Sequence, residues 1–120
     1  MLHTWTTKRA EICYTFVEDT IEIETFALDE IYRGKGFAKQ EMLDFVKYTQ
    51  QYDFTAVRLS AFDSRDSKSE AGLSQYYLEE FYKKLGFTIY DYVNIEGIET
   101  PRFVMLKSEW NSLIEENENV

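Results

Sequence analysis

A glycine-rich turn links a predicted strand to a predicted helix and reads Arg33-Gly34-Lys35-Gly36-Phe37-Ala38. Glycine has no Cβ atom, so the backbone of this turn can approach a ligand closely. Free backbone N–H groups at the start of a helix favour negative charge, and Arg33 and Lys35 add two cationic side chains. The turn is therefore a candidate phosphate-binding site, although the residues alone fit a solvated turn that starts a helix equally well.

Spacing excludes two common nucleotide-binding motifs. The run is too short for the phosphate loop of nucleotide triphosphatases, and no Ser or Thr follows Lys35. Lys39 stands where a dinucleotide-binding loop has its third glycine. We therefore expect neither of these two classes of protein.

The residues before the turn predict an antiparallel hairpin. β-branched and aromatic residues dominate residues 11–17 and 20–28, with Glu18-Asp19 as the polar turn between them. Strict alternation in the second strand gives one face with Ile21, Ile23 and Thr25 and an opposite face with Glu22, Glu24 and Phe26. Residues 2–7 are compatible with one more strand.

The residues after the turn predict a helix that ends near Tyr52. Its apolar face comprises Ala38, Met42, Phe45, Val46 and Thr49. A strand over 54–62 follows, which completes a parallel crossover unit, and the polar residues 63–72 predict a mobile surface loop.

The last part of the chain predicts a helix and a hairpin. A helix over 73–85 ends at Gly86 and has Tyr77, Leu78, Phe81 and Leu85 at core spacing. A strand over 87–92 is joined to a strand over 102–107 by a loop that contains Gly97 and Pro101. Ser108 is expected to cap a short terminal helix with an apolar stripe of Trp110, Leu113 and Ile114.

Composition indicates one compact domain spanning residues 1–120, since 44% of the 120 residues are apolar and 17% are aromatic. No run reaches the about 18 apolar residues of a membrane span, and no basic-then-apolar signal pattern opens the chain, so we expect a soluble, cytoplasmic protein without membrane contact. With one cysteine, Cys13, and one histidine, His3, the chain predicts no disulfide and no metal site.

Charge sets the expected partners. The chain has 13 Lys and Arg against 22 Asp and Glu, a formal net charge of −9. Direct nucleic-acid binding is disfavoured, whereas lysine-rich proteins, polyamines or aminoglycosides would be attracted. The charge could equally serve only to keep the protein soluble.

The sequence resembles the GNAT superfamily of N-acetyltransferases in two places. The run Arg33 to Ala38 matches the family's first motif, and Phe81-Tyr82-Lys83-Lys84-Leu85-Gly86-Phe87 resembles its later helix-to-strand segment. The resemblance implies an α/β fold (α+β by some schemes): a mixed, mostly antiparallel, splayed sheet of about six strands, two main helices and a short C-terminal helix.

The resemblance also implies acetyl-coenzyme A (acetyl-CoA) as co-substrate and direct transfer to an amine without a metal or covalent enzyme intermediate. The N–H groups from Gly34 through Lys35, Gly36 and Phe37 to Ala38, beside Arg33, would bind the pyrophosphate. The backbone of Ala27 and Leu28 would bind the pantetheine arm. Tyr82 matches the tyrosine that protonates the departing thiolate, and it could instead simply pack its helix onto the sheet.

Glu22 and Glu24 lie near where some family members carry a general base, and either could act directly or through water. Both could equally be solvated residues that pair across strands.

The chain departs from the family at its start and in its second motif. It lacks the usual first strand and the two following helices, and in this it resembles small phage-type acetyltransferases, which include an anti-CRISPR enzyme. Gln75 and Leu78 stand where the family often has Asn and Ala. An uncovered sheet edge makes a homodimer a further expectation.

These observations predict an acetyltransferase acting on a basic protein, at a lysine or N-terminus, with a small polyamine or aminoglycoside as second choice. The main alternative is a catalytically silent module that binds acyl-CoA or a protein. A third is an acidic mimic of DNA.

Overall fold

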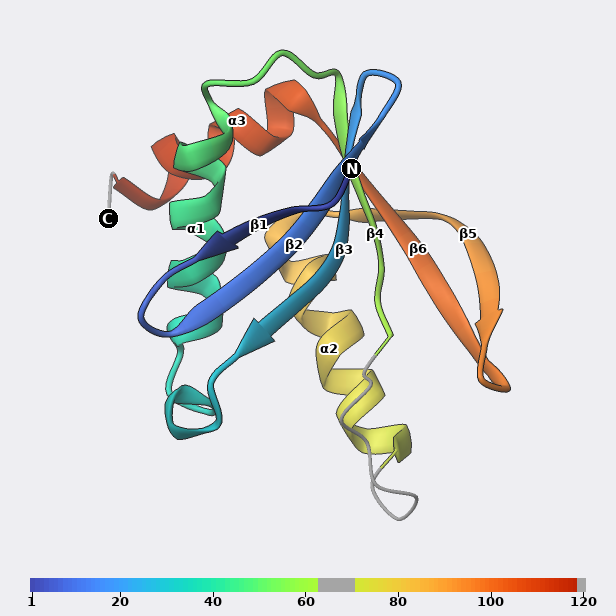
Figure 1. Ribbon diagram of the computed structural model, residues 1–120. Coiled ribbons are helices and arrows are strands. Elements are labelled where there is room, and N and C mark those ends of the chain that lie inside the picture. The colour runs from blue at the N-terminus through green and yellow to red at the C-terminus, as the bar shows by residue number, and fades with distance from the viewer. Residues whose placement is uncertain (63–70, 119–120) are drawn as a thin grey trace. The chain divides into compact units, whose positions relative to one another are not determined.

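The computed structural model describes residues 1–62 and 71–118 (Figure 1). Over these residues the chain is α+β, with a mixed six-stranded sheet and three α-helices, as predicted. Its elements are β1 His3–Thr6, β2 Ala10–Val17, β3 Thr20–Leu28, a 3-10 turn Glu30–Tyr32, α1 Phe37–Thr49, β4 Ala56–Ser60, α2 Ala71–Leu85, β5 Thr88–Ile95, β6 Ile98–Leu106 and α3 Lys107–Glu118.

The strand order of the sheet is β1-β2-β3-β4-β6-β5. β3 and β4 are neighbours and α1 lies between them in the chain, the arrangement expected for the crossover unit. Of the predicted loop over 63–72, residues 63–70 lie outside the described residues, and Ala71 and Gly72 already belong to α2.

The chain divides into two compact units. The first comprises Met1–Val57 and Leu106–Val120, and the second comprises Arg58–Met105. In the described residues, no helix is long and apolar enough to cross a membrane.

The predicted hairpin forms the sheet of the first unit. β2 and β3 pair antiparallel, with Val17 opposite Thr20, and Glu18 adopts φ 56° in the turn between them. β1 pairs antiparallel with β2, which confirms the strand expected near the N-terminus. Buried side chains such as Ile12 and Ile21, each 0% exposed, define the core face.

A β-bulge in β3 makes one predicted face wrong. Cys13 pairs with Thr25 and Tyr14 pairs with Ile23, so Glu24 has no partner opposite it in β2. An extra residue reverses the phase of alternation beyond it. Thr25 is therefore exposed rather than on the face of Ile23, and Phe26 is half-buried instead of lying with the glutamates.

The helix α1 covers the core face of β1 and β2. Met42, Phe45 and Val46 are fully buried, as the apolar pattern predicts. The ring of Phe45 lies 5.4 Å from that of Trp5 and 5.3 Å from that of Tyr14. Burying one such phenylalanine stabilises the fold by about 1.5–3 kcal/mol.

A cluster of tyrosine hydroxyls satisfies the polar end of this core. Tyr14 is 1% exposed, and its hydroxyl donates to that of Tyr48 at 3.3 Å and lies 3.0 Å from that of Tyr52. Burial raises the pKa of Tyr14 well above its ordinary value, whereas the hydrogen bond from Tyr14 lowers the pKa of Tyr48. The buried phenol therefore stays protonated.

The helix α3 is held against α1 by a buried hydrogen bond. The indole Nε1 of Trp110 donates to Thr49 Oγ1 at 2.8 Å, and both residues are fully buried. Leu113 is also buried, which confirms the apolar stripe of the terminal helix. The helix begins at Lys107 and includes Ser108, so the prediction that Ser108 caps it is wrong.

The hairpin of the second unit has a tighter turn than predicted. Glu96 and Gly97 both have positive φ and join β5 to β6, so the expected loop through Pro101 is wrong. Pro101 pairs with Tyr92 inside β6, and its carbonyl accepts from the Ala61 N–H at 3.0 Å. Proline lacks only its own backbone N–H donor and keeps its carbonyl, so a strand can accommodate it at one position.

The helix α2 packs on a face slightly different from the predicted one. Leu85 is buried and Gly86, with φ 110°, follows the last helical residue as expected. Tyr77 is 63% exposed, so its place at core spacing was wrong, whereas Gln75 and Tyr82 are buried. The buried face of α2 therefore comprises Gln75, Tyr82 and Leu85, and the predicted Leu78 and Phe81 are half-buried at its margin.

Candidate cofactor-binding and catalytic site

The glycine-rich turn has a backbone conformation that requires glycine twice. Gly34 has φ 73° and Gly36 has φ 83°, both in the left-handed region. A Cβ atom added at either position would have no neighbour within 4 Å, so the space around the turn is open. Among the described residues, no side chain caps α1 at Gly36. The N–H groups that begin α1 are thus suited to an anion.

The two cationic side chains of the turn bond to nearby backbone. Arg33 Nε donates to the Leu28 carbonyl at 2.9 Å, and Lys35 Nζ donates to the Ile31 carbonyl at 2.8 Å. Both residues are exposed. Arg33 thereby joins the glycine-rich turn to the end of β3, and Lys35 joins it to the preceding 3-10 turn.

The end of β3 leads directly into the turn. Ala27 is exposed and lies opposite Glu11, while Leu28 is half-buried and lies opposite Ala10. The bulge at Glu24 precedes them and bends the strand. The backbone that the sequence resemblance assigns to the pantetheine arm therefore follows an irregular, redirected piece of strand.

The two candidate bases lie close together on β3. Glu22 is half-buried and pairs in register with Thr15, and Glu24 is exposed and accepts a hydrogen bond from the Thr15 hydroxyl at 3.2 Å. Thr15 therefore lies beside both residues, opposite Glu22 in the ladder and hydrogen-bonded to the Glu24 carboxylate.

Tyr82 lies in α2, inside the second unit. It is 4% exposed and its ring lies 5.7 Å from that of Phe87 and 5.8 Å from that of Phe103. Burial raises the pKa of Tyr82 well above its ordinary value, so the hydroxyl keeps its proton at neutral pH. Burial therefore makes this hydroxyl a weaker acid than that of an exposed tyrosine. The predicted site residues of β3 and the turn all belong to the first unit.

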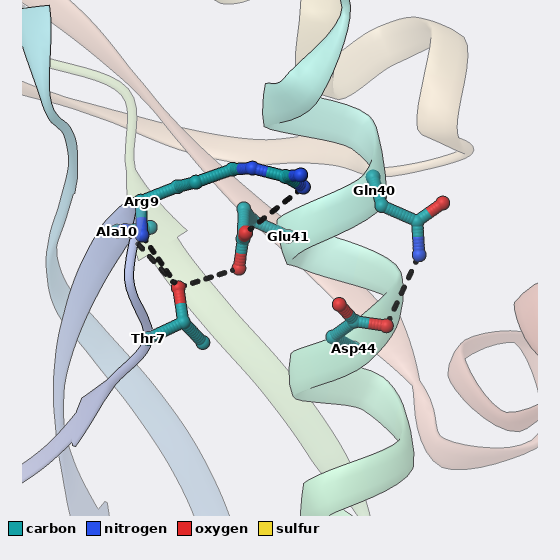
Figure 2. A network of polar contacts seen from close by, with 6 residues as sticks. All are labelled: Thr7, Arg9, Ala10, Gln40, Glu41 and Asp44. Carbon is teal, nitrogen blue, oxygen red and sulfur yellow. Dashed lines mark hydrogen bonds and ion pairs between the residues drawn. The ribbon is translucent and has the colours of Figure 1, made fainter. Parts of the chain in front are cut away.

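Sequence reasoning missed a polar network next to the turn. The Glu41 side chain is 4% exposed and lies 3.8 Å from the Arg9 guanidinium, and its other oxygen accepts from Thr7 Oγ1 at 2.9 Å (Figure 2). Glu41 stands at core spacing, three residues after Ala38 and four before Phe45. A charged residue at a core position of a helix is rarely buried without a partner, so Glu41 could have predicted this network.

The second motif of the chain also differs from its expected composition. Gln75, at 7% exposure, donates to the Ala61 carbonyl and, at 2.9 Å, to Glu79. The amide thus has partners inside its own unit. A contact from the side-chain nitrogen of Gln75 to a ligand would have to replace one of these two bonds.

Comparison with known proteins settles the fold. No protein-family model and no curated protein sequence matches the chain, but solved structures do. A GNAT family acetyltransferase from Elizabethkingia anophelis with acetyl-CoA bound is 18% identical over 82% of this chain and 68% of its own, with a TM-score of 0.57. This chain has the GNAT fold.

Two further GNAT-fold neighbours differ in length. Spermidine N-acetyltransferase from Vibrio cholerae, in complex with CoA and spermine, is 13% identical over 85% of this chain, with a TM-score of 0.65. The chain spans 60% of that protein. Anti-CRISPR protein AcrVA5 is 23% identical over 84% of this chain and 96% of its own, with a TM-score of 0.58. The present chain therefore resembles a short version of the fold.

Proposed function

We propose that the chain is an N-acetyltransferase that moves the acetyl group of acetyl-CoA to an amine. The observation that supports this most is the open turn of Gly34 and Gly36 at the start of α1, in a chain with the GNAT fold. Its uncapped N–H groups would bind the pyrophosphate, with Arg33 and Lys35 adding charge. The backbone of Ala27 and Leu28 would bind the pantetheine arm.

The reaction needs two proton transfers that this chain's residues can perform. The acceptor nitrogen forms a bond to the thioester carbonyl carbon and the carbon–sulfur bond breaks, so the amine loses a proton and the thiolate gains one. Glu22 or Glu24 would accept the amine proton, directly or through water. Tyr82, which matches the tyrosine of the family's later motif, would donate to the sulfur.

The acceptor that we propose is a basic protein, at a lysine or its N-terminus. A net charge of −9 attracts cations, and Glu22 and Glu24 place two of the carboxylates on β3. A small polyamine is the second candidate, supported by the spermidine N-acetyltransferase among the structural neighbours.

A thiol-release assay tests the proposal. Acetyl-CoA would be supplied with lysine-rich peptides, a peptide with a free N-terminus, spermidine or an aminoglycoside, and release of CoA would be followed. We expect turnover, and we expect Glu22→Gln or Glu24→Gln to lower kcat by about a hundredfold, the usual effect of losing a general base. The matched control is Glu11→Gln, on the neighbouring strand.

Binding of acetyl-CoA without turnover of any acceptor would instead favour the alternative, a silent module that senses acyl-CoA or binds a protein. Salt-sensitive binding to a nucleic-acid-binding protein without acetylation would favour the DNA mimic.

A further inference from the structure

The turn between β1 and β2 carries a side chain that reaches the glycine-rich turn. The guanidinium carbon of Arg9 lies 4.0 Å from the ring centre of Phe37 and 5.7 Å from that of Tyr32. These two aromatic residues flank the run Arg33 to Gly36 on either side. Their rings also meet edge to face at 5.6 Å and 89°. One arginine therefore lies over the aromatic residues at both ends of the glycine-rich turn.

Arg9 is itself held in place by α1 and by its own turn. The buried carboxylate of Glu41 lies 3.8 Å from the guanidinium, while Thr7 Oγ1 donates to Glu41 and accepts from the N–H groups of Arg9 and Ala10 at 3.2 and 3.1 Å (Figure 2). The Arg9 carbonyl accepts from the Asp29 N–H at 2.8 Å, at the start of the segment that leads to the glycines. These contacts link the turn between β1 and β2 both to α1 and to the segment before the glycine-rich turn.

The glycine-rich turn needs such support. Gly34 and Gly36 permit the left-handed conformation, and the same freedom makes the unbound turn costly to order. Ordering a loop upon binding reduces affinity, and fixing the loop beforehand recovers it. Contacts that hold Tyr32 and Phe37 therefore limit the positions that the turn's N–H groups can sample.

We propose that Arg9 and Glu41 are positioning residues that preorganise the glycine-rich turn for the pyrophosphate of CoA. Neither is placed against the reacting atoms. Arg9 fixes the aromatic flanks of the turn, and Glu41 fixes Arg9. The identity of the ligand in this inference rests on the proposed function. The restraint of the turn's conformation rests on the observed contacts alone.

Kinetics with two thioester donors separate positioning from general damage. Acetylpantetheine has the thioester and lacks the pyrophosphate and nucleotide. We expect Arg9→Met to raise the KM for acetyl-CoA about tenfold, leave kcat within about twofold, and leave the KM for acetylpantetheine unchanged. Arg9→Lys keeps the charge and loses the planar group that lies over Phe37, so it should restore only part of the affinity.

Arg102→Met is a matched control in the second unit. Arg102 is 32% exposed against 35% for Arg9, pairs with Asp91 at 3.7 Å and lies 5.2 Å from the Tyr90 ring. The control should leave the KM for acetyl-CoA unchanged. Equal rises in the KM for both donors in Arg9→Met, or no rise in either, would overturn the proposal.

Amide hydrogen exchange without ligand tests the same inference if the protein binds no acetyl-CoA. We expect the amides of residues 34–38 to exchange faster in Arg9→Met and in the double variant Arg9→Met/Glu41→Gln than in the wild type and in Arg102→Met. The double variant avoids an unpaired buried carboxylate, which could unfold the single variant. Unchanged exchange at these amides in a folded variant would contradict the positioning role, whereas absent acetyl-CoA binding by the wild type would contradict the proposed function.

Discussion

At the scale of single residues, two glycines with left-handed backbone conformation determine the shape of the glycine-rich turn. Gly36 ends the turn and caps α1 at φ 83°, where a side chain meets no neighbour and the only cost is backbone strain. The sequence predicted the turn because its glycines and cations are adjacent in the chain. It could not predict the network of Thr7, Arg9 and Glu41, because those residues meet only after folding.

Gly36→Ala should lower the free energy of unfolding by about 1–2 kcal/mol, the strain of a left-handed alanine. Gly36→Asn should cost less, since asparagine visits this conformation more readily. Urea denaturation of both variants measures the difference. Equal stability of Gly36→Ala and wild type would mean that the turn does not hold the conformation described.

Tyr82 predicts a specific alkaline instability. The pKa of Tyr82 in the folded protein is raised above the unfolded value of about 10. The contribution of Tyr82 to the free energy of unfolding is therefore fully present below about pH 10 and is lost as the pH rises through the folded pKa. Tyr82→Phe removes this loss. Above pH 10 the variant's free energy of unfolding should fall less steeply than that of wild type, by about 1.4 kcal/mol per pH unit.

The control for this experiment is Tyr77→Phe, in the same helix and 63% exposed. Its pH dependence should follow the wild type. A Tyr82→Phe curve with the wild-type slope would indicate that the buried phenol ionises as readily as a free one.

At the scale of elements, periodicity predicted each helix and strand but not the local irregularities. The apolar stripe of α1 and the hairpin of β2 and β3 follow directly from it. The alternation of apolar and polar residues did not predict the bulge at Glu24, because the residues on either side of it fit a regular strand equally well. Pro101 suggested a loop because proline disrupts most strands, yet β6 continues through it.

Deleting Glu24 should remove the bulge and restore regular alternation from Ile23 through Thr25 to Phe26, with every buried side chain kept on its face. The shortened strand should fold but point Ala27 and Leu28 differently, and the affinity for acetyl-CoA should fall at least about tenfold. Circular dichroism checks that the deletion variant folds, and calorimetric titration measures its affinity for acetyl-CoA.

Glu24→Thr is the matched control for the deletion, since it keeps the bulge and removes the carboxylate. It should retain acetyl-CoA affinity. If the deletion binds acetyl-CoA as well as this control does, the bulge has no part in forming the cofactor site.

At the scale of the whole molecule, the short chain and its acidity were evident from the sequence, and the GNAT resemblance in two motifs anticipated the fold. The acceptor could not be predicted, because it depends on surfaces formed by residues far apart in the chain. A homodimer stays a prediction: β1, a strand of four residues, lies at the edge of the sheet. Sedimentation at working concentration would contradict it by showing only monomers.

The most direct test of the central claim is calorimetric titration with acetyl-CoA of the wild type, Gly36→Glu and Gly97→Glu. Gly97 shares φ 83° with Gly36 and lies in the β5–β6 turn, so the two variants introduce similar strain and the same charge at different places. We predict micromolar binding by the wild type and Gly97→Glu and none by Gly36→Glu. No binding by the wild type, or equal binding by all three proteins, would contradict the assignment of the glycine-rich turn as the CoA site.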